Sequence, residues 1–323
     1  MNNYTLALEN DKLYDVIPFV TFLKNNEGTD IEIIVNQESH CLRYTKVYDL
    51  LDLFNFKSVT IFTDNAVEKH DCYKIKNNNW SHWLSTMAIK FDQTKDYSWN
   101  NEKLFGCFYG RPTASRLGIA GYLNSKYPDK SLLCLNFNYS EENGRKLFDL
   151  ERLFAWNSNT ITQFELLCSQ QEKYRSKFQA YNYNTFNYEI NHPLNDLYKN
   201  IFVDIVVEAH LFGNSFYPTE KIARAIMCKK PFIVVAPLFY LEYLKQMGFK
   251  TFNKFWAEDY DYLGANNRYV AILTQLDYLA NLTQDQLIEL NKQVQPIVEH
   301  NYQLLKNMQY NTNIIKKEPH NEY

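Results

Sequence analysis

Residues 201–236 read IFVDIVVEAHLFGNSFYPTEKIARAIMCKKPFIVVA, and this stretch decides the fold class. It contains two apolar runs of strand length, over 201–209 and 231–236, of the kind that forms buried parallel strands. Between them, residues 219–228 have a helical pattern with Thr219 as the expected N-cap. A strand, a helix and a second strand in this order indicate an α/β protein with a parallel sheet.

The same alternation continues upstream. Residues 104–110 and 131–137 are expected strands, and residues 115–123 between them are an expected helix with Ser115 as its N-cap. Downstream, residues 241–247 predict a helix that Gly248 closes.

The first part of the chain carries a second unit of this type. Residues 31–35 and 59–63 predict strands, and the helical KVYDLLDLF lies between them. A polar, turn-rich stretch over 90–102 predicts a domain boundary. We therefore expect two Rossmann-like α/β domains facing a cleft, over residues 1–98 and 99–310, followed by a flexible tail over 311–323.

Composition narrows the function classes. The formal net charge is −3, and the positive residues are dispersed, so nucleic acid is not a favoured partner. The longest apolar run falls short of the 18 residues that a membrane span needs, and the N-terminal residues lack the pattern of a signal peptide. The six cysteines include no Cys-x-x-Cys pair, which favours reduced thiols, a cytoplasmic location and no zinc site.

Charged residues fall where an α/β sheet binds anions. Ligands of open parallel sheets lie at the carboxyl ends of the strands, where helix N-termini attract phosphate. Glu208 ends one predicted strand and is placed to accept hydrogen bonds from ribose hydroxyls. Lys221 and Arg116 lie in the first turns of two helices, and Arg111 follows a strand end, so the cations are placed to clamp a diphosphate.

Each of these residues also has a simpler interpretation. Glu208 can form a surface ion pair, and Lys221 can be a solvated lysine of a first helical turn. Arg116 can pair with Asp149 or Glu151.

Several familiar motifs are missing from the sequence. It has no Walker A loop, no G-x-G-x-x-G and no G-x-S-x-G, which argues against ATP hydrolysis, dinucleotide dehydrogenation and serine-hydrolase chemistry. Asp259-Tyr260-Asp261 is an Asp-x-Asp sequence in a loop-like context. We interpret it as a turn and expect no metal site.

Two stretches resemble the α1,3-fucosyltransferase family. EAHLFGNSFYPTEKIARAIMCKKP (208–231), followed by FIVVAP, is similar to that family's C-terminal motif, in which Glu ends a strand and Tyr-x-Thr-Glu-Lys opens a helix. KLFGCFYGRPTASRLGIAGYL (103–123) is similar to its strand, short loop and helix-initial Arg. The resemblance extends over roughly 100–260 and does not reach the first domain.

The resemblance implies a fold of the GT-B type and a metal-independent, inverting sugar transfer without a bound cofactor. It implies a nucleotide-sugar co-substrate, GDP- or UDP-linked, in the second domain, and an acceptor in the first. Tyr217, Thr219 and Glu220 would then bind the donor, with Glu220 on its ribose or sugar, and Lys221 and Arg116 on the diphosphate. The chain departs from the family in having Ala209 after Glu208 and Pro218 in the variable position of the motif.

The function we expect is transfer of a sugar from a nucleotide-sugar donor to a hydroxyl of a glycan, a protein or modified DNA. The alternative is a non-catalytic module that binds a nucleotide sugar or a phosphate. An inverting enzyme needs a base on the acceptor side. Glu38, His40 and Asp64 follow the strand ends at Val35 and Thr63. Glu38 is our choice, because a carboxylate shielded by the closing cleft would have its pKa raised toward the working range, and His40 and Asp64 are the alternatives.

Overall fold

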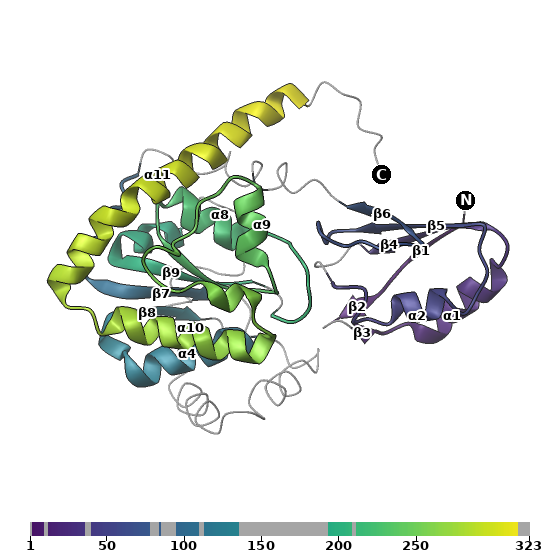
Figure 1. Cartoon of the computed structure of the whole chain (residues 1–323), viewed down its shortest axis with the longest axis horizontal. Coiled ribbons are helices and arrows are strands. Elements are labelled where there is room, and N and C mark those ends of the chain that lie inside the picture. The colour runs from purple at the N-terminus through teal and green to yellow at the C-terminus, as the bar shows by residue number, and fades with distance from the viewer. Residues whose placement is uncertain are drawn as a thin grey trace.

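The computed structural model describes residues 2–9, 12–35, 40–77, 84, 95–109, 113–135, 193–208 and 211–315. Over these residues the protein is α/β, as predicted, with two four-stranded sheets whose strand pairings are all parallel (Figure 1). A short antiparallel pair, β2 (Leu8–Glu9) and β3 (Lys12–Leu13), accompanies the first sheet.

The first sheet has the strand order β1-β4-β5-β6. Its strands are β1 (Asn2–Thr5), β4 (Asp30–Val35), β5 (Ser58–Thr63) and β6 (Lys74–Asn77). Side chains alternate between buried and half-buried along β4, as expected of a strand with one face on a core. Helices α1 (Val16–Asn25) and α2 (Val47–Leu51) lie on the same side of this sheet (Figure 1).

The second sheet has the order β10-β9-β7-β8 and is covered on both faces. Its strands are β7 (Lys103–Tyr109), β8 (Ser131–Leu135), β9 (Ile201–Val207) and β10 (Phe232–Val235). Helices α4 (Ala114–Lys126) and α10 (Ala265–Ala280) lie on one side, and α8 (Glu220–Met227) and α9 (Tyr240–Gln246) lie on the other (Figure 1). Every residue of β9 is buried, because helices cover both faces of this sheet.

The remaining described elements surround the second sheet. They are the 3-10 helices η1 (Pro128–Lys130), η4 (Pro193–Asn200) and η5 (Asp259–Tyr262), and the long helix α11 (Gln284–Ile315), which packs on α8. None of the helices within the described ranges is long and apolar enough to cross a membrane.

The second sheet changes the direction of its strand order between β7 and β9. From β7 the chain passes through α4 to β8 on one side, and from β9 it passes through α8 to β10 on the other. Such a reversal is the switch point at which open parallel sheets bind ligands, beyond the carboxyl ends of the two central strands.

Two hydrophobic clusters form separate cores. The first packs residues from Leu6 to Ile61, and the second packs residues from Leu84 to Leu305. Leu84 and Tyr97 lie before the boundary that we expected at 98–99 and belong to the second cluster.

Local details correct two of the sequence predictions. Thr113, not Ser115, is the N-cap of α4, because the first intrahelical bond runs from the Leu117 amide to the Thr113 carbonyl. Helix α2 spans five residues instead of the nine of KVYDLLDLF. Thr219 is the N-cap of α8 as predicted, and Gly248 follows α9 with a φ of 94°.

Candidate functional site

Arg116 lies at the switch point of the second sheet. It comes from the first turn of α4, it is 3% exposed, and its Nε and Nη2 each donate to the carbonyl oxygen of Val207 at 3.2 Å. Val207 is the last residue of β9, and the guanidinium supplies the donors for its carbonyl where the strand ends. The guanidinium therefore joins the helix after β7 to the end of the neighbouring strand β9, where the two halves of the sheet meet.

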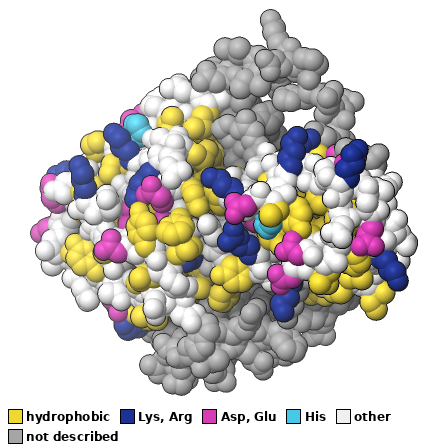
Figure 2. All heavy atoms as spheres, turned by 45° about the vertical axis from the view of Figure 1, so that its right-hand side comes forward, with side chains coloured by type: hydrophobic (Ala, Val, Ile, Leu, Met, Phe, Trp, Pro, Cys, Tyr) yellow, Lys and Arg dark blue, Asp and Glu magenta, His cyan; other side chains and the backbone are white. Residues whose placement is uncertain are grey.

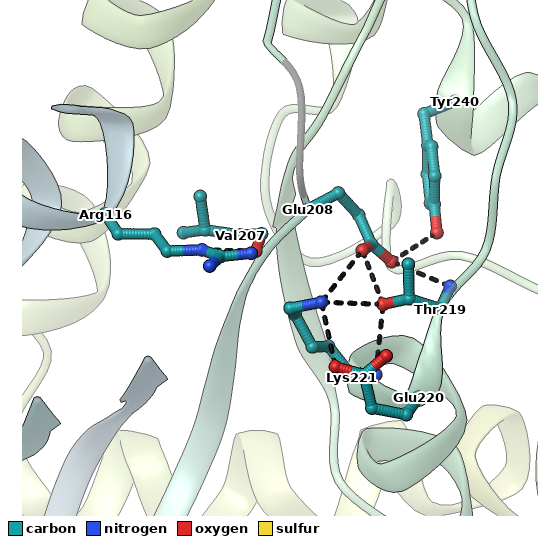
Figure 3. A network of polar contacts seen from close by, with 7 residues as sticks. All are labelled: Arg116, Val207, Glu208, Thr219, Glu220, Lys221 and Tyr240. Carbon is teal, nitrogen blue, oxygen red and sulfur yellow. Dashed lines mark hydrogen bonds and ion pairs between the residues drawn. The ribbon is translucent and has the colours of Figure 1, made fainter. Parts of the chain in front are cut away.

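Glu208, the residue after β9, is the centre of a buried network (Figure 3). Its Oε1 accepts hydrogen bonds from the Thr219 amide at 3.2 Å and from the Tyr240 hydroxyl at 2.8 Å. Its Oε2 accepts from the Thr219 hydroxyl at 2.6 Å. Glu208 thus ties the end of β9 to the N-terminus of α8 and to α9. Of the surface ion pair that we weighed for it, the surface location is wrong, since the side chain is buried, but a lysine partner is present in Lys221 at 3.8 Å.

Thr219 holds the first turn of α8. Its Oγ1 accepts a hydrogen bond from the Lys221 amide at 3.2 Å, which satisfies one of the free amides at the helix N-terminus. Its hydroxyl also donates a hydrogen bond to Glu208, so the N-cap of α8 is fixed to the residue after β9.

Lys221 is held by three oxygen atoms of the protein. Its Nζ lies 2.9 Å from Glu220 Oε1, 3.1 Å from Thr219 Oγ1 and 3.8 Å from Glu208 Oε2. Its side chain is 16% exposed, so the interpretation as a solvated lysine is wrong. An incoming phosphate has to exchange with at least one of these acceptors.

Glu220 is an ionised partner of that lysine. Burial by itself raises the pKa of the Glu220 carboxyl, but Lys221 outweighs it by charge and hydrogen bonding, and with Arg224 it lowers the pKa to about 2. The carboxylate stays charged at neutral pH and can accept hydrogen bonds from a hydroxyl-bearing ligand.

The other predicted site residues are placed as follows. Tyr217 is half-buried, two residues before the N-cap of α8. Arg111 and Glu38 lie outside the described residues, as do Asp149 and Glu151, the alternative partners of Arg116.

Among the alternative bases, His40 is 2% exposed and Asp64 is half-buried directly after β5.

Two residues at this edge were missed by the sequence analysis. The sequence pattern gave no sign of Tyr240, because its hydroxyl reaches Glu208 only through the packing of α9.

Arg268 on α10 is 2% exposed and donates from Nη1 to the carbonyls of Leu211 at 2.9 Å and Ala236 at 2.5 Å, which follow β9 and β10. Burial lowers the pKa of Arg268 to about 10, so it remains charged at neutral pH and braces both strand ends.

The Asp-x-Asp sequence has a structural role. Asp261 is buried in η5, and its two carboxylate oxygens accept from the amides of Leu241 and Glu242, each at 3.0 Å. It therefore caps the N-terminus of α9, in line with our interpretation of a turn. In the part of the chain that the structure describes, His, Cys, Asp and Glu form no group able to hold a metal ion.

No protein family, no curated protein and no solved structure matches this chain. Figure 2 shows positive, negative and apolar side chains interspersed over the face drawn, without a broad area of one sign among its described residues.

Proposed function

We propose that this chain is a glycosyltransferase of the GT-B type, which binds a nucleotide-sugar donor at the switch point of the second sheet and transfers the sugar to a hydroxyl acceptor. The observation that carries the proposal is the placement of Arg116 and Lys221 in the first turns of two helices that follow β7 and β9. A diphosphate at this point would meet two helix N-termini and two cations.

The network around Lys221 supports a polar ligand that carries both anionic and hydroxyl groups. The phosphate oxygens are strong acceptors that can replace Glu208 or Thr219 at the ammonium. The Glu220 carboxylate would then accept from ribose or sugar hydroxyls, since Lys221 and Arg224 keep it ionised. The donor is GDP- or UDP-linked in this proposal, and the acceptor is a glycan, a protein or modified DNA.

A second candidate function is a module that binds a nucleotide sugar or a phosphate without catalysis. The observation that favours it is that Arg116 and Lys221 at the switch point are cations, which can bind a phosphate but cannot take the proton of an acceptor hydroxyl. The two functions differ in turnover. A catalyst consumes the donor when an acceptor is added, whereas a binding module leaves it intact.

The proposal is tested by titrating the protein with GDP, UDP and their sugar conjugates in a calorimeter, and by following thermal unfolding with each. A ligand of the folded state raises the unfolding temperature by mass action. Lys221→Ala should weaken the binding by roughly 1.5–3 kcal/mol, the range for hydrogen bonds to charged groups. Lys245→Ala is the control, because Lys245 is also paired with an acid, Glu242, but lies on α9 outside the network. The proposal fails if none of these compounds binds the wild-type protein.

A further inference from the structure

Asn65, two residues beyond β5 of the first sheet, is hydrogen-bonded to both sheet units. It is fully buried. Its Oδ1 accepts from the amides of Val67 at 3.2 Å and Phe216 at 3.0 Å. Its Nδ2 donates to Glu68 Oε2 at 2.9 Å and to the Asn214 carbonyl at 3.2 Å. Both ends of the amide thus connect the first sheet unit to residues 214–216, which precede α8.

The orientation of this amide is determined by its surroundings. Glu68 is 5% exposed, and its carboxylate also accepts from the Tyr48 hydroxyl at 2.8 Å and the Leu42 amide at 3.2 Å. A carboxylate facing Asn65 requires a donor there, so the NH₂ end points to Glu68 and the oxygen points to the Phe216 amide. The substitution Asn65→Asp would replace this donor by a carboxylate oxygen, which would repel the Glu68 carboxylate.

Two further contacts join the same segments. The Ala66 amide donates to the Phe216 carbonyl at 3.2 Å, so residues 65 and 66 engage both backbone groups of Phe216. Gly213 has a φ of 79°, and a Cβ there would lie 2.9 Å from Cys41 Cβ. We call these contacts of residues 65–66 and 41 with residues 213–216 the junction.

The junction leads into the candidate donor site. Phe216 packs its ring against Tyr240 and Tyr243, with centroids 5.1 and 5.3 Å apart. The Tyr240 hydroxyl donates to Glu208. Thr219, three residues after Phe216, is the N-cap of α8 and accepts from the Lys221 amide. A shift of Phe216 would therefore move both the ring beside Glu208 and the chain that enters α8.

We propose that Asn65 is a positioning residue, which holds residues 213–216 in place from the first sheet unit and so keeps the Glu208, Thr219 and Lys221 network assembled. The inference rests on the proposed function for its ligand, a nucleoside diphosphate. Because coupling between two sites is reciprocal, nucleotide bound at the network should also stabilise the junction.

The test is hydrogen exchange of the peptides that span 211–221 and 40–48, measured on the full chain with and without GDP or UDP. Asn65→Asp should accelerate exchange in both peptides and weaken nucleotide binding, each by about tenfold or more, as expected when a buried hydrogen-bonded group is left facing a charge. Exchange in α10 is the internal reference, because a general loss of stability would accelerate it as well. Asn55→Asp is the matched control, since Asn55 is exposed in the same sheet unit.

A second pair of variants tests the junction from the other side. Gly213→Ala adds a methyl group at a positive φ against Cys41, whereas Gly28→Ala adds one at a similar φ of 73° with no atom within 4 Å. Only the first should accelerate exchange over 211–221. Should Asn65→Asp not fold, Asn65→Ala removes the amide without adding a charge and serves the same comparison.

The outcomes separate the two proposals. Exchange over 211–221 that is unchanged in the Asn65 variants and in Gly213→Ala overturns the positioning role. If the wild type binds neither nucleotide, the proposed function fails, and the exchange comparison still decides whether Asn65 holds the segment. Faster local exchange with wild-type nucleotide affinity would overturn the coupling to the donor site.

Discussion

The guanidinium of Arg116 on α4 donates two hydrogen bonds to the carbonyl oxygen of Val207, the last residue of β9. One side chain thereby bridges the two halves of the sheet at the point where its strand order reverses. The same group is a cation in the first turn of a helix. Arg116 thus has a structural role that the structure shows, and a phosphate-binding role that we propose.

Substitutions of Arg116 separate these roles. Arg116→Ala should destabilise the fold and weaken nucleotide-sugar binding by roughly 1.5–3 kcal/mol. Arg116→Lys keeps the charge without the planar fork, so it should recover part of the binding but less of the stability. Calorimetric titration and urea unfolding measure the two quantities. Wild-type affinity in Arg116→Ala would leave only the structural role.

Thr219→Ala should lower the free energy of unfolding by more than the loss of an ordinary helix cap does. The substitution removes the acceptor for the Lys221 amide and also one donor to the buried Glu208 carboxylate. A cap alone contributes about 1 kcal/mol, as Thr283→Ala should show, since the exposed Thr283 hydroxyl accepts from the Gln286 amide at the start of α11. Loss of one of the hydrogen bonds to the buried Glu208 carboxylate should bring the total for Thr219→Ala to about 2–3 kcal/mol. Urea unfolding measures both. Thr219→Ser keeps the hydroxyl and should lie near the wild type, and equal losses in the two alanine variants would contradict the network.

Glu220 should contribute stability that depends on pH. Its pKa in the folded protein is about 2, below its ordinary value of 4.5, because Lys221 and Arg224 outweigh the effect of burial. The contribution is therefore complete above pH 4.5 and is lost as the pH falls toward 2. Glu220→Gln should lower stability at pH 7 and flatten this acid dependence, measured by urea unfolding at a series of pH values. An unchanged dependence would show that the ion pair contributes nothing.

Sugar transfer should proceed without a divalent metal. In the proposed site Arg116 and Lys221 would neutralise the leaving diphosphate, and the carboxylate of Asp261 is already occupied by two amides of α9. Donor consumption in the presence of EDTA should equal that in its absence. Loss of turnover that manganese or magnesium restores would contradict this expectation and direct attention to Asp259 and Asp261.

The catalytic base remains a prediction from the sequence. Inverting transfer needs a group that takes the proton of the acceptor hydroxyl, and Glu38 follows the carboxyl end of β4. Glu38→Gln should preserve donor binding and reduce transfer by roughly 100-fold or more. Transfer at the wild-type rate in that variant would remove Glu38, and Asp64, beyond the end of β5, would be tested next.

The elements that the sequence predicted well depend on residues close together in the chain. The strands β9 and β10 follow from apolar runs, which only Asp204 in β9 interrupts, and the N-cap at Thr219 follows from one side chain beside its own helix. Strand β1 could not be found in this way. Its residues NNYT are mostly exposed and polar, and they form a strand because β4 offers a free edge in register with them.

The sequence by itself therefore determined the α/β class, the parallel sheet around 201–236, and the places of Glu208 at a strand end and of Arg116 and Lys221 at helix starts. The tertiary structure alone decided the partners of those residues. Arg116 meets Val207 across 91 positions, and Asn65 meets Phe216 across 151. A buried polar group must find a partner, but which one it finds depends on strand order and on the packing of loops distant in sequence, and local periodicity carries no information on either.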